Sequence, residues 1–191
     1  MAAKTLSTVE TLTRYILGDV STSQVPGDIF TYSNSAIFTL TETNVIAVSS
    51  VLHNDVELSS SEYSYDSSTN KVTVSASLTA GDTIEVQYTY YPNYSSTEIQ
   101  TYVRVAITHL SVSNYATFQI ASDGTLYPEP EDNEEHLIAL LTSILIEPEN
   151  KSYRLPDVSV NVPKSVPTHD LIRKTIAIFK HNTHGNFFVT N

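Results

Sequence analysis

The feature that most constrains the fold of this chain is a block of short alternating segments between residues 44 and 92. In its last segment, apolar residues occupy every second position from Ile84 to Tyr90. Successive side chains of a strand point to opposite faces, so this pattern is typical of a strand with one buried face. About six such strands at hairpin spacing predict a small antiparallel sandwich or barrel.

Polar turns separate the expected strands. Asn54 and Asp55 follow His53 at one turn, residues 66–70 form a polar loop, and Gly81 precedes the last strand. Asn and Asp tolerate left-handed backbone angles, which makes them suitable for tight hairpin turns. We therefore expect consecutive strands of this block to pair as hairpins.

Four segments outside the block have the capping residues and the apolar spacing of amphipathic helices. Their predicted caps are Ser7, Ser95, Asp132 and Thr168. The first three caps are each followed three residues later by a glutamate, which is the spacing of a capping box. We expect these helices to end near residues 18, 121 and 148, with Lys180 in the last turn of the fourth.

The order of these elements predicts an α+β fold with an insertion. Residues 1–27 and 93–191 are expected to form a helical bundle core of about four helices, and residues 28–92 an inserted small antiparallel β-sandwich or barrel. The Ser-, Thr-, Gly- and Pro-containing stretch from residue 19 to residue 34 is interpreted as a linker.

An extended C-terminal arm is predicted at residues 148–167. Four prolines in this stretch exclude a helix and a central strand. Val158, Val160 and Val162 alternate with polar residues, which favours an arm that adds to the sheet edge of a neighbour.

Composition excludes several classes of function. A formal net charge of -11 argues against a basic surface that grips nucleic acid. The absence of cysteine excludes disulfides, thiolate metal sites and a cysteine nucleophile. No apolar stretch has the length of a signal peptide or a bilayer span, so we expect a protein made in the cytoplasm, without contact with a membrane.

Candidate chemistry is sparse. The acidic run at residues 129–135 lacks the glycine and the ligand spacing of an EF-hand, and His181 and His184 have no evident third metal ligand. His109 is interpreted as a packing residue. The chain has neither a G-x-S-x-G elbow nor a Gly-rich phosphate loop. We expect no enzyme activity, no cofactor and no metal.

Tyrosines near the end of the block allow two interpretations. Tyr88, Tyr90, Tyr91 and Tyr94 could form a sugar-stacking platform or supply the contact area of a subunit interface. Alternation of Tyr88 and Tyr90 with polar residues favours core or interface positions.

The block VIAVSSVLHNDVELSSSEYSYDSSTNKVTVSASLTAGDTIEVQYTYY resembles the small β modules inserted in structural proteins of tailed phages. Its position between a capped N-terminal helix and a C-terminal helix pair with an arm resembles the head–tail connector (adaptor, head-completion) proteins of tailed bacteriophages. That resemblance implies a non-enzymatic ring, commonly a dodecamer, in the neck of the virion.

The resemblance further implies three kinds of partner. These are the portal protein, a tail-completion, stopper or tail-tube protein, and viral DNA passing through the ring. The acidic balance suits a channel wall along which phosphates slide. The residues expected at subunit or portal interfaces are Val158, Val160, Val162, Phe179, Phe187, Phe188, Tyr90 and Tyr91. The alternative function is a carbohydrate-binding or adhesive β module of a phage tail or surface protein.

Overall fold

The structure is a computed structural model, and it describes residues 3–148, 152–154, 159–161 and 167–184. The chain divides into two compact units. The helical unit consists of the described residues of Met1–Gly18 and Ser95–Asn191, and the β unit of Asp19–Tyr94. Four helices that pack together and antiparallel sheets confirm the predicted α+β class.

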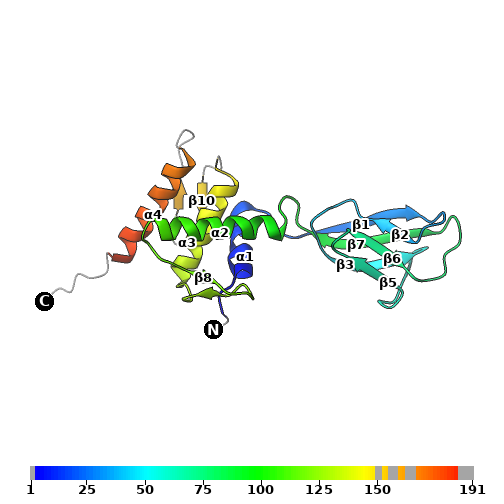
Figure 1. Cartoon of the computed structure of the whole chain (residues 1–191). Coiled ribbons are helices and arrows are strands. Elements are labelled where there is room, and N and C mark those ends of the chain that lie inside the picture. Colours follow the sequence, from blue (N-terminus) through cyan, green and yellow to red (C-terminus); the bar gives the residue numbers. More distant parts are fainter. Residues whose placement is uncertain (1–2, 149–151, 155–158, 162–166, 185–191) are drawn as a thin grey trace. The chain divides into compact units, whose positions relative to one another are not determined.

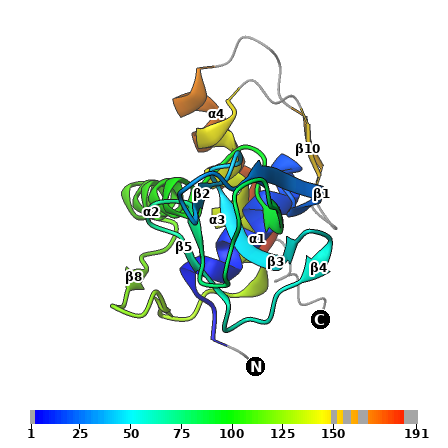
Figure 2. The same ribbon diagram turned by 90° about the vertical axis from the view of Figure 1, so that its right-hand side faces the viewer.

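The helical unit is built around one central helix. Its helices are α1 (Leu6–Leu17), α2 (Ser96–Val112), α3 (Asp132–Ile146) and α4 (Thr168–His184). Helix α3 contacts each of the other three, as Figure 1 and Figure 2 show. Its residues Leu137, Ile138, Leu140, Leu141 and Ile144 are fully buried. A helix that is apolar on all sides requires neighbours on all sides, which explains its position.

A short hairpin secures the N-terminal segment to this unit. It is formed by β8 (Gln119–Ile120) and β9 (Leu126–Tyr127). The Leu6 amide donates to the Gly124 carbonyl over 2.9 Å, and the Leu126 amide donates to the Lys4 carbonyl over 3.0 Å. These bonds fix the start of α1 against the hairpin.

A buried ion pair connects α1 to α2. The Arg14 guanidinium donates to the Glu10 carboxylate over 2.9 Å, and both side chains are almost fully buried. The Gln100 amide donates to the second Glu10 oxygen over 2.9 Å, and Arg14 also reaches the Ser96 hydroxyl at 3.4 Å. Each buried charge therefore has partners, as burial requires.

The β unit contains a four-stranded and a three-stranded antiparallel sheet. The first has the order β1 (Thr22–Thr31), β7 (Thr83–Tyr90), β3 (Val45–His53), β4 (Val56–Glu57). The second has the order β2 (Ile37–Thr39), β6 (Lys71–Val74), β5 (Tyr63–Asp66). One core joins the two sheets, with Val51, Ile84 and Val86 from the first and Val72 and Val74 from the second. The alternation predicted from the sequence is seen in β7, where Ile84, Val86 and Tyr88 are buried.

Two predicted local features are confirmed. Asn54 and Asp55 have φ angles of 50° and 67° in the turn between β3 and β4, so both adopt the left-handed conformation expected of a tight hairpin. Ser95 and Glu98 form the predicted capping box of α2, with each side chain accepting the backbone N–H of the other.

Other predicted boundaries are wrong. Most of the supposed linker at residues 19–34 is strand β1, which pairs with β7, so residues 19–27 belong to the β unit and not to the helical core. A bulge between Gln24 and Asp28 shifts the register of β1, and Val25 and Ile29 are exposed, so the strand shows no regular apolar alternation. Helix α2 ends at Val112 and not near Ala121, because Asn114 takes a φ of 51° and β8 follows.

The predicted caps of two other helices are displaced. Thr5 caps α1 and forms the capping box with Thr8, while Glu10, predicted to pair with Ser7, is in the buried ion pair. At α3 the Glu134 carboxylate accepts the Glu131 N–H, so this helix is capped one residue earlier than predicted. Both sequences offer overlapping capping pairs, and tertiary contacts select between them.

The predicted arm at residues 148–167 is only partly described. Strand β10 (Ser152–Arg154) pairs antiparallel with β11 (Ser159–Asn161). These two segments therefore run back along each other and are not one extended span. Pro156 and Pro163 lie outside the described residues. Among the described helices, none is both long enough and apolar enough to cross a membrane.

Candidate protein-binding site

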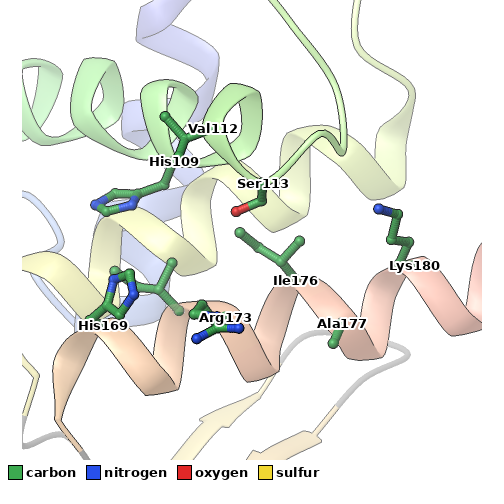
Figure 3. Close-up of a pocket in the computed structure, with 9 residues that line it drawn as sticks. His109, Val112, Ser113, His169, Arg173, Ile176, Ala177 and Lys180 are labelled. Carbon is green, nitrogen blue, oxygen red and sulfur yellow. The ribbon is translucent and has the colours of Figure 1, made fainter.

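A groove of about 400 Å³ lies between the C-terminal part of α2 and helix α4 (Figure 3). We call it the α2–α4 groove. Its lining residues are His109, Val112, Ser113, His169, Ile172, Arg173, Ile176, Ala177 and Lys180. His109 and His169 lie at one end of the groove in Figure 3, and Lys180 and Ser113 lie towards the other.

Helix α2 brings an exposed apolar stripe to this groove. Its inward face is buried at Ile99, Val103, Ala106 and Leu110. A second set of residues, Tyr102, Val105, His109 and Val112, repeats at intervals of three and four and therefore shares another face. Of these, Tyr102 and Val105 are each 39% exposed and Val112 is 76% exposed.

Helix α4 provides the floor and the charged rim. Ile172 and Ile176 are 2% and 3% exposed, so they are part of the core and still form the apolar floor. Arg173 and Lys180 are exposed at the rim. The Lys180 ammonium donates to the Asn114 carbonyl at 3.3 Å, which directs it across the groove towards the end of α2.

The charge of the groove is opposite to that of the chain. Three of the ten Lys and Arg residues of the chain, Arg173, Lys174 and Lys180, lie in α4. None of the described residues that line the groove is a carboxylate. An apolar floor with a basic rim is suited to an acidic protein segment that carries an apolar anchor.

A second hollow, of about 390 Å³, has acidic walls. It is lined by Thr8, Thr11, Leu12, Asp132, Glu135 and His136. The Lys4 ammonium bonds to Asp132 and lies 3.5 Å from Glu135, whose other oxygen accepts the Thr8 hydroxyl. The bond from Lys4 lowers the pKa of Asp132. Burial opposes the charge of Lys4, but the two carboxylates outweigh it and raise the Lys4 pKa.

Beside this hollow, the connection from β9 to α3 is exposed. We call residues 127–134 the acidic segment. Tyr127 is 71% exposed, and Glu129, Glu131 and Asp132 are also exposed. The hydrogen bonds of Leu126 and Lys4 hold its two ends against the N-terminal segment. The segment is therefore a fixed, exposed, acidic surface with one aromatic ring.

The lowered pKa of Asp82 in the β unit reflects a turn and not a binding site. Asp82 accepts hydrogen bonds from the Asn54 side chain, the Thr79 amide and the His53 ring. These bonds lower the pKa of Asp82 to about 2, from 3.8. Asn54 also accepts the Thr83 amide, so the cluster ties the β3–β4 turn to the start of β7.

The interface residues predicted from the sequence lie in different parts of the structure. Phe179 is 6% exposed and belongs to the core of the helical unit. Tyr90 is partly buried against the β core, with its ring centroid 6.0 Å from that of Tyr88. Tyr91 is half-buried.

The valines and the C-terminal phenylalanines fall in the predicted arm and tail. Val160 is in β11. The remaining four predicted interface residues, Val158, Val162, Phe187 and Phe188, lie outside the described residues. Of the predicted interface residues that the structure describes, none lines the α2–α4 groove.

The sequence carries a signal for the groove residues of α2, which is a second apolar face. Helix α2 has two apolar faces, and the one that carries Ile99, Val103, Ala106 and Leu110 is buried. Tyr102, Val105 and Val112 follow the same period on another face. His109, interpreted as a packing residue, is half-buried in the groove.

Two of the tyrosines considered for a sugar-stacking platform, Tyr88 and Tyr90, pack into the β core. Tyr88 is fully buried, and its hydroxyl donates to the Asp28 carboxylate over 3.0 Å. Burial raises the pKa of Tyr88 to about 12. Tyr90 packs against the same core. These two residues stabilise the sandwich.

In the part of the chain that the structure describes, no group of three or more His, Asp or Glu side chains is placed to hold a metal ion. A scan against protein-family models and a search of curated proteins found no match to this sequence.

Proposed function

We propose that the chain is a structural protein of a tailed-phage virion, a head–tail connector that assembles as a ring between the portal and the tail. It acts without catalysis and without a cofactor. Its partners are further copies of itself, the portal protein above, and a stopper, tail-completion or tail-tube protein below.

The observation that carries this proposal is the way in which the β unit interrupts the helical unit. Gly18 ends α1 in the left-handed conformation, and Ser95 caps α2. Between them, the Asn93 amide donates to the Asp19 carboxylate at 3.0 Å, so the chain enters and leaves the β unit at one place. This arrangement supports a helical core with a β insertion, as the resemblance to connector proteins implies.

The two charged surfaces of the helical unit are a second support. A protein that assembles needs surfaces complementary to its partners, and these commonly combine an apolar centre with a charged rim. The α2–α4 groove has both. The formal net charge of -11 also suits a channel through which DNA slides without being held.

Imaging of virus particles tests the proposal. Mass spectrometry of purified virions is expected to detect the protein, and electron cryomicroscopy to place it as a ring between the portal and the tail. Absence from purified virions, or density at the tips of tail fibres, would contradict the connector function. The latter result would favour an adhesive role.

A further inference from the structure

We propose that the α2–α4 groove of one subunit binds the acidic segment, residues 127–134, of a second copy of this chain. The contact is head to tail, because the groove and the segment are different surfaces. This contact would be the interface between neighbouring subunits of the proposed ring. Only its location in the virion depends on the proposed connector function.

Charge is the first argument. Arg173 and Lys180 line the groove, and the described lining contains no carboxylate. The acidic segment exposes Glu129, Glu131 and Asp132. Opposite charges of this kind steer association and suppress wrong pairings, whereas two grooves or two segments would repel each other.

Shape and apolar contact are the second argument. Tyr127 is 71% exposed at the start of the segment, although the hairpin that carries it is held in place. Ile172 and Ile176 form the groove floor, and the exposed Val112 flanks it. A tyrosine ring in an apolar pocket with charged neighbours is a common anchor in protein interfaces.

The positions of the two surfaces are the third argument. In Figures 1 and 2 the start of α3 lies on the side of β8, and α4 begins on the opposite side of the helical unit. Bonds to Lys4 hold the segment there. A head-to-tail contact between such surfaces adds subunits in one direction. It forms a ring when the rotations between successive subunits add up to a full turn.

Two sets of charge reversals test the direction of the contact. Arg173→Glu with Lys180→Glu changes only the groove, and Glu129→Lys with Glu131→Lys changes only the segment. Each variant alone is expected to lose self-association, with the dissociation constant rising on the order of tenfold or more. An equimolar mixture is expected to regain association in sedimentation velocity, because the intact segment of one variant meets the intact groove of the other and the two reversed surfaces again carry opposite charges.

A matched control distinguishes the loss of a groove contact from the effect of a change in net charge. Lys174 is exposed on α4 but does not line the groove. Lys174→Glu changes the net charge as much as Arg173→Glu and is expected to leave association unchanged. Equal effects of the two single variants would overturn the proposal.

Disulfide trapping detects the contact even when association is weak. The natural chain has no cysteine, so introduced cysteines are unique. Glu129→Cys and Ala177→Cys, placed in separate full-length chains and mixed under oxidising conditions, are expected to form a covalent heterodimer. Thr97→Cys, exposed at the start of α2, replaces Glu129→Cys as the control.

These experiments distinguish a failure of the proposed contact from a failure of the proposed connector function. Cross-linking at the rate of the control would overturn the proposed contact and assign the groove to a different occupant. Specific cross-linking together with absence from virions would retain the head-to-tail contact and reject the connector. A ring in virions without specific cross-linking would retain the connector and reject this interface.

Discussion

The helical unit and the β unit expose apolar side chains in different ways. In the β unit, the exposed apolar residues are spread over several strands, as at Val25, Ile37 and Val56. In the helical unit, Tyr102, Val105 and Val112 follow one face of α2 and end at the α2–α4 groove. The comparison shows that exposed apolar residues are scattered in the β unit, while those of α2 are continuous with the groove that we propose as an assembly surface.

Loss of one partner of the buried ion pair should produce the largest effect, confined to the helical unit. Arg14→Met leaves the carboxylate of Glu10 buried without its cation and is expected to lower the free energy of unfolding by about 3–5 kcal/mol. Chemical denaturation followed by helical circular dichroism measures this change.

A double variant sharpens that prediction. Glu10→Met with Arg14→Met removes both charges and is expected to cost less than Arg14→Met alone. Arg104→Met, at an exposed position of α2, is the control and should have little effect. A double variant less stable than the single one would show that the charges, and not the space they fill, stabilise the unit.

The β unit should be most sensitive at Gly27. A Cβ atom added there would lie 2.2 Å from the Val86 carbonyl oxygen, which belongs to the backbone of the neighbouring strand. Gly27→Ala is expected to lower the free energy of unfolding of the β unit by about 2–3 kcal/mol. Ser23→Ala, exposed in the same strand, is the control.

Tryptophan is absent, so tyrosine fluorescence is the readout for that variant. Tyr88 lies in the core of the β unit and reports its unfolding. The helical transition should stay unchanged. A common shift of both transitions would contradict the independence of the two units.

Much of the β unit could be predicted from the sequence because its signals are local. Alternation placed β7, and left-handed Asn and Asp placed the turn after β3. Strand β1 was not predicted because its partner lies about 60 residues further along the chain and a bulge between Gln24 and Asp28 interrupts its alternation. The requirement for glycine at position 27 could not be predicted either, because the strand that leaves no space for a side chain there is distant in sequence.

The helical unit was harder to predict, and its groove could not be located. Periodicity indicates which face of a helix is apolar but not which neighbour covers it. The two apolar faces of α2 look equivalent in sequence, and it is the packing of the neighbouring helices that separates the buried Val103 from the exposed Val105. The proximity of Arg173 and His109 depends on the packing of α4 in the same way.

Acid should affect the β unit through Asp82. Its pKa is lowered to about 2 in the folded chain from 3.8, so its contribution to stability is present above pH 3.8 and is lost as the pH falls towards 2. Asp82→Asn is expected to lower the melting temperature at pH 7 and to flatten the loss of stability over that interval. Asp55→Asn, exposed in the adjoining turn, is the control.

The measurement is the melting temperature of each variant from pH 7 down to pH 2. Equal pH dependence of Asp82→Asn and the unmodified chain would show that the turn cluster does not contribute through this carboxylate.

The smallest effect is expected at Thr175 in α4. Its hydroxyl is buried, and among the described side chains it is the one buried polar atom without a hydrogen-bond partner. Thr175→Val removes this unpaired group at nearly constant volume and is expected to raise the free energy of unfolding by up to about 1 kcal/mol. Thermal denaturation measures the change.

The matched control is Thr142→Val in α3, where the hydroxyl donates to the Ile138 carbonyl over 2.8 Å. This variant should be less favourable than Thr175→Val. The opposite order would mean that the hydroxyl of Thr175 is satisfied in solution.

Removal of the β unit tests most directly whether the helical unit alone folds and carries assembly. Asp19 and Asn93 are bonded, so a short linker can join Gly18 to Ser95. In this shortened chain we predict a cooperative helical unfolding transition and the same cross-link between Glu129→Cys and Ala177→Cys as in the full chain. A molten or insoluble product, or a folded product that fails to cross-link where the full chain does, would contradict the account.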